Sequence, residues 1–357
     1  YDAPILHALR EAARAVRCEG MIGARGGIHM VNLDVHGDQA LALLTAVCAH
    51  NGARDLQRTG LPPVGYAPAD ILSVEKLDNI QKDIEFRMKT EEGGFTDDSF
   101  RVTGDPRLPW CHVLSNPVFG TLVSDKALGF TWAINARENK LTPWFNDTAS
   151  DNRGEMLLLK SGGKIHDTVW GAQACFTADA ARYTGRAAEI ETSVTVRIPE
   201  KGMFKQVELT LRNSGDEERD VQAAYYIEPV LGINRQHARH TAARWEDGAL
   251  LLRNPFSAVG GCLILTAQGG ADGCDCDRGA FLSGAWGGGT LSPLPAPCAA
   301  VIVRRRLPPG GRVSIRFLLG FAARETAALR YPSLAWKQTA HTMLVPRLRT
   351  PDRALDL

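Results

Sequence analysis

The sequence lacks the features that mark several classes of protein. Its 357 residues contain no apolar run close to the roughly 18 residues needed to cross a bilayer. Neither sign of charge is in excess, because the chain has 41 basic and 40 acidic residues and a formal net charge of +1. Such a balance creates no electrostatic attraction to nucleic acid or to an anionic membrane. The composition therefore predicts an ordinary globular protein with neither of them as a partner.

Signal-peptide and catalytic motifs are also missing. The opening stretch "YDAPILHALREAARAVR" is amphipathic and carries acidic residues, which is not typical of a secretory signal. "SGGK" at 161–164 and "GAWGGGT" at 284–290 lack the spacing of a phosphate-binding P-loop, and both are typical of hairpin turns. No G-x-S-x-G nucleophile motif occurs. The residues by themselves predict no complete active site.

Cysteine is scarce and irregularly spaced. The chain has eight, at positions 18, 48, 111, 175, 262, 274, 276 and 298. Their neighbours are mostly apolar, which predicts free thiols in a reducing compartment such as the cytoplasm. Cys274 and Cys276 form the one close pair, in "DGCDCDRG". A C-x-C pair without a second pair is a weak metal signal, so we expect a polar turn there and no metal.

What the sequence does contain, from about 84 to 322, is a spacing of apolar residues with a period of two. Strands are predicted at 119–125, 128–134, 186–199, 204–213, 219–229, 249–254, 261–267, 299–307 and 312–322. Short turns without crossover helices indicate antiparallel pairing, and so many strands favour two packed layers. We therefore predict a mainly β protein, with one large antiparallel two-sheet β-sandwich (a supersandwich) at 84–322.

The flanking segments have a different character. Residues 1–83 alternate helical and strand patterns and predict a small α/β segment, whereas 323–349 predicts a helical linker. Thr350 is a good N-cap and Pro351 suits the first helical turn, so a helix is expected at 350–357. A helix of two turns is marginal by itself. We expect it to be the start of a further helical domain in a longer protein.

The loop "ARENKLTPWFNDTASD" at 136–151 concentrates polar side chains around one large aromatic residue. The candidate substrate-binding residues are Arg137, Asn139, Trp144, Asn146 and Asp147. An indole gives a sugar ring an apolar face, and these polar groups supply donors and acceptors for hydroxyls. We expect Trp144 to face a cleft, and Trp132, within a strand, to lie in the sandwich core. The alternative is a solvated connection whose short side chains serve as scaffold.

Motifs in the right order along the chain carry a family resemblance. They include "GGFTDD" (93–98), "PWCHVLSNPVFGTLVSDKALGFTWAINARENKLTPWFNDTASDNRGE" (109–155), "YYIEPVLG" (225–232) and "RTPDRALDL" (349–357). Together these motifs resemble glycoside hydrolase family 94, the inverting phosphorylases of β-linked glucosides. The resemblance is greatest to β-1,2-oligoglucan phosphorylases and to the C-terminal part of cyclic β-1,2-glucan synthases.

The resemblance implies that this chain is the non-catalytic part of a larger enzyme. In that family the sandwich precedes a helical connector and an (α/α)6 barrel, which holds the catalytic acid and the phosphate site. Those residues have no matching positions here, so no catalytic residue is expected in this chain. The whole enzyme would use inorganic phosphate as co-substrate, without a cofactor or metal, and release α-glucose 1-phosphate. Implied partners are a β-linked glucan oligosaccharide, the chain's own barrel and a second copy in a cytoplasmic homodimer.

Two other classes of function remain open on the sequence. A stand-alone carbohydrate-binding module would keep the sandwich and need no barrel. A structural or oligomerisation domain would have loops that bind nothing. The sequence that follows Leu357 would separate these readings, because several hundred residues with a helical period would favour the enzyme part and a stop codon would favour one of the other two.

Overall fold

The structure is a computed structural model, and it describes residues 69–77, 85–145, 153–233, 235–291, 297–324, 348–349 and 354–355. The chain divides into two compact units, Tyr1–Tyr66 and Ala67–Leu357. The first unit, and with it most of the α/β segment predicted at 1–83, lies outside the described residues. Most of the helical linker predicted at 323–349 does too.

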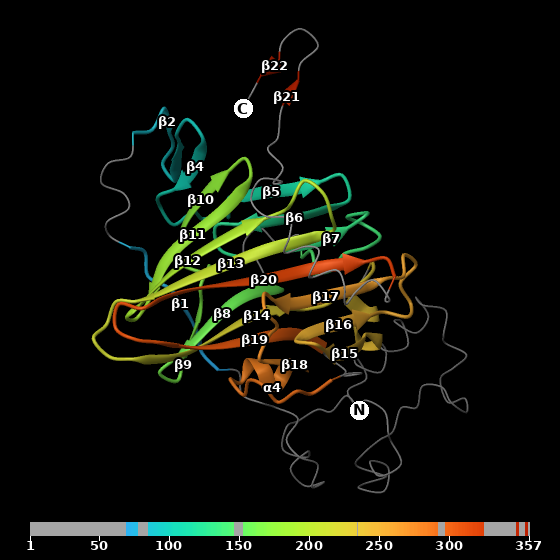
Figure 1. The fold of residues 1–357 in the computed structure, drawn as a ribbon. Helices are drawn as coiled ribbons and strands as arrows, with labels where there is room; N and C mark the ends of the chain where they lie inside the picture. Colours follow the sequence, from blue (N-terminus) through green and yellow to red (C-terminus); the bar gives the residue numbers. More distant parts are fainter. Residues whose placement is uncertain are drawn as a thin grey trace, which may run out of the picture. The chain divides into compact units, whose positions relative to one another are not determined.

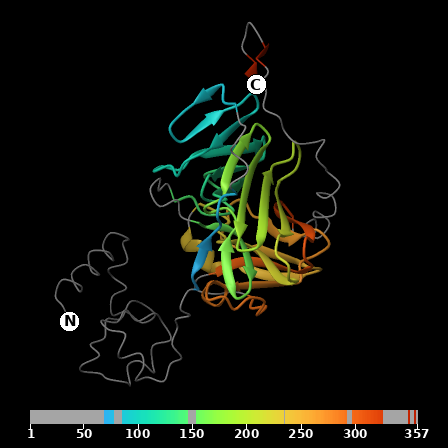
Figure 2. The ribbon, with the colours of Figure 1, turned by 90° about the vertical axis from the view of Figure 1, so that its left-hand side faces the viewer.

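Two large sheets build the second unit (Figures 1 and 2). The 11-stranded sheet has the order β15 (Ala242–Glu246), β16 (Ala249–Arg253), β17 (Cys262–Ala267), β20 (Arg312–Ala322), β13 (Phe204–Asn213), β12 (Ile190–Arg197), β11 (Ala180–Ala187), β10 (Gln173–Thr177), β4 (Ser99–Val102), β3 (Gly93–Phe95) and β2 (Met88–Lys89). The six-stranded sheet has the order β1 (Ile71–Ser73), β9 (Lys164–Asp167), β8 (Glu155–Ser161), β14 (Arg219–Ile227), β19 (Pro297–Leu307) and β18 (Gly273–Asp277). Their pairs are antiparallel except β1 with β9. The predicted large antiparallel sandwich is confirmed.

A smaller sheet of three strands lies against the sandwich. It consists of β5 (Cys111–Asn116), β6 (Phe119–Ser124) and β7 (Phe130–Ala133), paired as two successive antiparallel hairpins. Its inward face places Leu114, Phe119 and Val123 in the main hydrophobic core. The next residues along the strands point to the opposite face, because side chains alternate along a strand. This sheet therefore has one face in the core and one face away from it.

The strand patterns follow from what covers each face. In β12 every second residue is buried, from Ile190 to Val196, because one face of this strand packs on the core and the other is only partly covered. In β14 nearly every residue from Val221 is buried. Its outward Tyr226 is covered by α4 (Arg278–Leu282), whose Phe281 ring stacks at a centroid distance of 5.3 Å. A strand covered on both faces therefore shows no alternation of buried and exposed residues.

Two sequence predictions about turns are wrong and one is confirmed. "SGGK" is a hairpin turn between β8 and β9, with both glycines at positive φ. "DGCDCDRG", expected as a polar turn, contains strand β18. The segment 284–290 is not a hairpin but follows α4. Asp275 of β18 explains both differences. Its buried carboxylate accepts hydrogen bonds from the backbone N–H of Gly287 at 2.5 Å and of Gly289 at 3.1 Å, which holds 284–290 against β18.

The carboxyl-terminal residues are described only in part. The structure has two short strands, β21 (Leu348–Arg349) and β22 (Ala354–Leu355), which pair with each other. Thr350 and Pro351, at which the sequence predicts that a helix begins, lie outside the described residues. The start of a further helical domain at 350–357 stays a prediction.

Candidate functional site

The structure places the predicted loop residues in different environments. Arg137 is exposed, and its Nε lies 3.4 Å from the Glu138 carboxylate. Asn139 is fully buried, and its amide donates to the Ala133 carbonyl at 3.1 Å. Within the described residues its Oδ1 has no hydrogen-bond partner. Asn146 and Asp147 lie outside the described residues. The contacts of Asn139 are those of loop scaffold, and its role in binding stays a prediction.

Trp144 is 44% exposed and lies at the edge of an aromatic strip on the outer face of the small sheet. Its ring centre is 5.4 Å from that of Phe130, and Phe130 stacks on Trp132 at 5.1 Å. We call Trp144, Phe130 and Trp132 the aromatic strip. Trp144 is exposed, as predicted, and that it faces a cleft stays a prediction.

The prediction that Trp132 belongs to the sandwich core is wrong. Thr131 and Ala133 are fully buried on the inward side of β7, so Trp132 between them points outward and is only half-buried. Gly120, its partner on β6, makes room for the indole, because a Cβ atom at that position would lie 2.3 Å from the Trp132 ring. Trp110 is not part of the strip, since it packs on Phe100.

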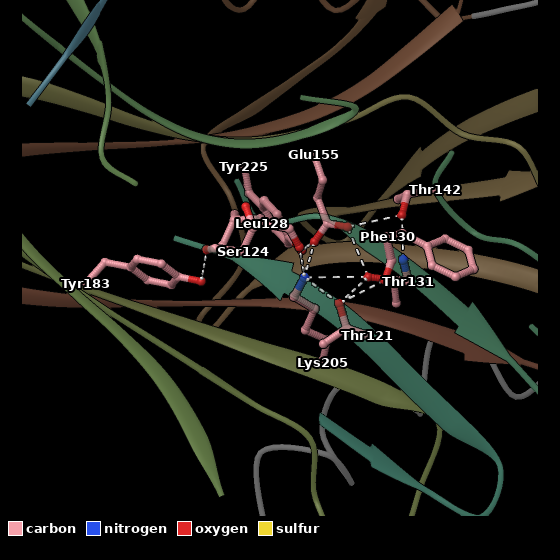
Figure 3. A network of polar contacts seen from close by, with 10 residues as sticks. All are labelled: Thr121, Ser124, Leu128, Phe130, Thr131, Thr142, Glu155, Tyr183, Lys205 and Tyr225. Atoms are coloured by element: carbon pink, nitrogen blue, oxygen red, sulfur yellow. Dashed lines mark hydrogen bonds and ion pairs between the residues drawn. The ribbon is translucent and has the colours of Figure 1, made fainter. Parts of the chain in front are cut away.

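A buried polar network lies behind the strip, on the inward face of the same hairpin (Figure 3). Its centre is an ion pair between Lys205 of β13 and Glu155 of β8, both of whose side chains are fully buried. The Lys205 ammonium also donates to the Thr121 hydroxyl at 3.1 Å and to the Leu128 carbonyl at 3.0 Å. The Tyr225 hydroxyl of β14 donates to Glu155 at 2.5 Å. The network thus connects both large sheets with β6.

The same network holds the start of the candidate loop. The Thr142 hydroxyl donates to Glu155 at 3.1 Å and accepts the backbone N–H of Thr131 at 2.7 Å. The Thr131 hydroxyl donates to Glu155 at 3.0 Å. Thr142 is two residues from Trp144, so Glu155 positions the indole through a hydroxyl and the backbone.

Burial and charge set the ionisation of this network. Burial lowers the pKa of the Lys205 ammonium, and the adjacent Glu155 carboxylate opposes that effect. Burial, with the negative charge of Glu155, raises the pKa of the Tyr225 hydroxyl well above its usual value. The hydroxyl of Tyr225 therefore remains a donor to Glu155. The side chains of Glu155 and Lys205 are inaccessible, so the network supports the site and does not contact a ligand.

A second charged cluster lies beside the loop's far end. Glu228, in the "YYIEPVLG" motif, is nearly buried and forms ion pairs with Arg235 and, at 2.8 Å, with Arg278. Its backbone N–H donates to the Gly154 carbonyl at 2.8 Å. The Arg235 guanidinium lies 4.8 Å from the centre of the Phe145 ring, next to Trp144. This cluster contacts Phe145, which follows Trp144 in the chain, whereas the Glu155 network holds Thr142, which precedes it.

The described part of the chain has neither a metal-binding cluster nor a membrane-spanning helix. Among the described residues, no group of three or more His, Cys, Asp and Glu side chains is placed to hold a metal ion. The helices of the described part include none long and apolar enough to cross a membrane. The six cysteines in those ranges form no disulfide bond, and four of them are buried.

Sequence reasoning missed the buried network, although one signal was present. In "FKQVELTLRN" Lys205 has the same parity as Val207 and Leu209, so the alternation itself places an ammonium group on the core side. A lysine on a buried face requires a counter-charge. Its partner Glu155 lies 50 residues earlier on another strand, and no local pattern indicates that pairing.

The chain is similar to several known proteins. The chain is 31% identical to the cyclic beta-(1,2)-glucan synthase NdvB of Rhizobium meliloti (strain 1021) over 224 residues, which are 56% of this chain and 8% of that protein. A putative kojibiose phosphorylase from human microbiome has 5% identity and a TM-score of 0.37, over 69% of this chain and 33% of that one. A bacterial glucoamylase complexed with acarbose has 7% identity and a TM-score of 0.41, over 75% and 37%.

The family model matches a larger share of the chain than the sequence relative does. It is described as the glycosyl hydrolase 94 supersandwich domain and covers residues 100–332. These residues include the small sheet, the aromatic strip, the Glu155 network and all strands from β5 to β20. The chain therefore belongs to the glycosyl hydrolase 94 family, of which it contains the supersandwich domain.

Proposed function

We propose that this chain is the non-catalytic, glucan-contacting part of an enzyme that acts on β-1,2-linked glucan by phosphorolysis. The family membership supports a place beside a catalytic domain. The similarity to a cyclic beta-(1,2)-glucan synthase supports the β-1,2 linkage. The same similarity favours a second candidate, a part of a cyclic glucan synthase. Because the chain spans only 8% of that relative's length, both candidates concern a larger protein.

The observation that carries the proposal is the aromatic strip. Trp144 is 44% exposed although it is large and apolar, and its ring packs against that of Phe130. A fixed indole loses little conformational freedom on binding, and its face suits the C–H face of a pyranose ring. Stacking of this kind contributes on the order of 1 kcal/mol. Arg137 and the polar residues after Trp144 supply hydrogen bonds to sugar hydroxyls in this proposal.

The chemistry of the whole enzyme follows from the bond it breaks. Phosphate is already anionic, so as nucleophile it needs positioning more than a general base. One carboxylic acid must protonate the leaving glycosidic oxygen, and attack from the opposite face inverts a β-link to α-glucose 1-phosphate. In this proposal the (α/α)6 barrel supplies that acid and the phosphate site. The sandwich supplies the wall of the sugar cleft and a surface for a second, cytoplasmic copy.

The test is glucan binding by the 357-residue chain, measured by calorimetry with linear β-1,2-linked oligosaccharides. Trp144→Ala should weaken binding several-fold and leave the melting temperature nearly unchanged. Trp245→Ala is the matched control, because Trp245 is a half-buried tryptophan on the edge strand β15, outside the strip. An earlier melting transition with unchanged binding would show that Trp144 is packing, and the proposal would fail.

A further inference from the structure

A cavity of about 380 Å³ opens at one end of the sandwich, outside the aromatic strip. Four segments meet there: β1 and the residues after it, the residues after β4, the turn between β6 and β7, and the loop between β9 and β10. The lining includes Ser73, Lys76, Asp105, Asp125, Lys126 and Trp170. This volume is at the lower end of the range for ligand pockets, which suits a single ring.

Trp170 is held in place before any ligand arrives. Its backbone N–H donates to the buried Asp167 carboxylate at 3.3 Å, and its carbonyl accepts the N–H of Val74 at 2.9 Å. The Arg153 guanidinium lies 4.3 Å from the centre of the indole and is also paired with Asp167. The ring is nevertheless 37% exposed and lines the cavity. An indole fixed in this way offers an apolar surface at low entropic cost.

The neighbouring glycine permits this arrangement. Gly171 has a φ of +84°, a conformation that L side chains rarely adopt. A Cβ atom there would lie 2.4 Å from the Val74 carbonyl oxygen. The close approach of β1 to the Trp170 loop, which forms one wall of the cavity, therefore depends on this residue.

The polar lining offers donors and acceptors side by side. The Lys126 ammonium lies 3.3 Å from the Asp105 carboxylate and donates to the Pro106 carbonyl at 2.7 Å. The Lys76 ammonium donates to the Gly104 carbonyl at 2.6 Å. An ammonium group has three N–H donors, and the contacts of Lys76 within the described residues use one. The side chain of Asp105 is 91% exposed, so its carboxylate can accept hydrogen bonds from a ligand.

The charges in the lining balance each other. Two ammonium groups are matched by the carboxylates of Asp105 and Asp125, so the cavity has no surplus positive charge to attract an anion. A neutral ligand with several hydroxyls uses both kinds of group, because a hydroxyl donates to a carboxylate and accepts from an ammonium. An aromatic wall with paired donors and acceptors is the arrangement that a pyranose ring requires.

We propose that this cavity is a second sugar site, which holds one neutral pyranose ring against Trp170 and hydrogen-bonds its hydroxyls through Lys126 and Asp105. It shares no lining residue with the aromatic strip. The β6–β7 hairpin nevertheless links the two surfaces, because its turn lines the cavity and β7 carries Phe130 and Trp132. The sugar class follows from the lining alone; that the ring is a residue of β-1,2-linked glucan rests on the proposed function.

Calorimetric titration of the 357-residue chain tests this proposal, with a linear β-1,2-linked glucan oligosaccharide and with inorganic phosphate as separate probes. We expect two glucan sites. Trp170→Ala should weaken one of them roughly three- to tenfold and leave the other unchanged. Asp105→Ala is the second variant, because an exposed side chain can be removed without unfolding the sandwich. It should weaken the same site, whereas Trp245→Ala should weaken neither.

The variants separate this inference from the proposed function. If Trp144→Ala has no effect and Trp170→Ala weakens glucan binding, the cavity is a sugar site although the strip is not. If both Trp170→Ala and Asp105→Ala bind glucan as the parent chain does, the inference is overturned. Phosphate binding that is lost in Lys126→Ala, without glucan binding in the cavity, would also overturn it. A melting curve for each variant identifies any loss of binding that is caused by unfolding.

Discussion

Substitution of Glu155 is the sharpest test of how the sandwich holds its candidate loop. Glu155→Gln keeps the size of the side chain but removes the counter-charge of Lys205, whose ammonium group is fully buried. Breaking a buried ion pair by neutralising one partner costs about 3–5 kcal/mol, because the other charge stays desolvated. At roughly 2 °C for each kcal/mol in a domain of this size, the melting temperature should fall by roughly 6–10 °C.

Two further variants show whether the cost comes from the unpaired charge. In Glu155→Gln combined with Lys205→Met, both charges are absent, so much of the lost stability should return. Glu138→Gln is the surface control in the same part of the chain, since its ion pair with Arg137 is exposed and is worth about 0–1 kcal/mol. Free energies of unfolding come from denaturant titrations by linear extrapolation. A loss below about 1 kcal/mol in Glu155→Gln, or simple additivity in the double variant, would refute this reasoning.

Two other predictions follow from shifted pKa values. Burial lowers the pKa of His112 below its usual value of about 6.5, so the folded state binds fewer protons than the unfolded state, and stability is lost as the pH falls through about 6.5. His112→Phe should therefore reduce the fall in melting temperature between about pH 7.5 and pH 5.5, and an unchanged fall would contradict this. Burial raises the pKa of Cys276 to about 12 and of Cys274 to about 11. In a native thiol titration the exposed Cys111 should react before these two, and early reaction of Cys276 would show that β18 is open.

Strands with one covered face were predictable from their alternation, whereas of the strands covered on both faces β14 was predicted and β8 was not. In β12 and β13 apolar and polar residues alternate in the sequence, because one face of each strand is only partly covered. In β8 "EMLLLKS" five consecutive residues are buried, so the period of two disappears and the strand was missed. β18 was missed because its polar residues are typical of a turn. Its Asp275 is buried and accepts backbone N–H groups from the loop after α4, and the sequence alone does not distinguish such an aspartate from one in an exposed turn.

The candidate site was predictable only in its exposed part. Pro143 and the surrounding polar residues indicated correctly that Trp144 would be exposed. Whether Trp132 points inward depends on which side of the small sheet meets the core, and that is decided by packing against other strands. The partners of Lys205 are likewise set by topology, because Glu155 and Thr121 reach it from two other sheets.

The short strand β1 has a consequence for the design of shortened versions of this protein. It pairs in parallel with β9 and closes that edge of the six-stranded sheet, which Figure 2 shows as the blue arrow next to the green strands. A version that begins at residue 85 would present the backbone groups of β9 to solvent, and an open edge recruits strands from other molecules. Keeping residues 69–77 would keep β9 paired and remove this edge as a place where two recombinant sandwiches could join, so the choice of starting residue bears directly on whether such a protein stays in solution.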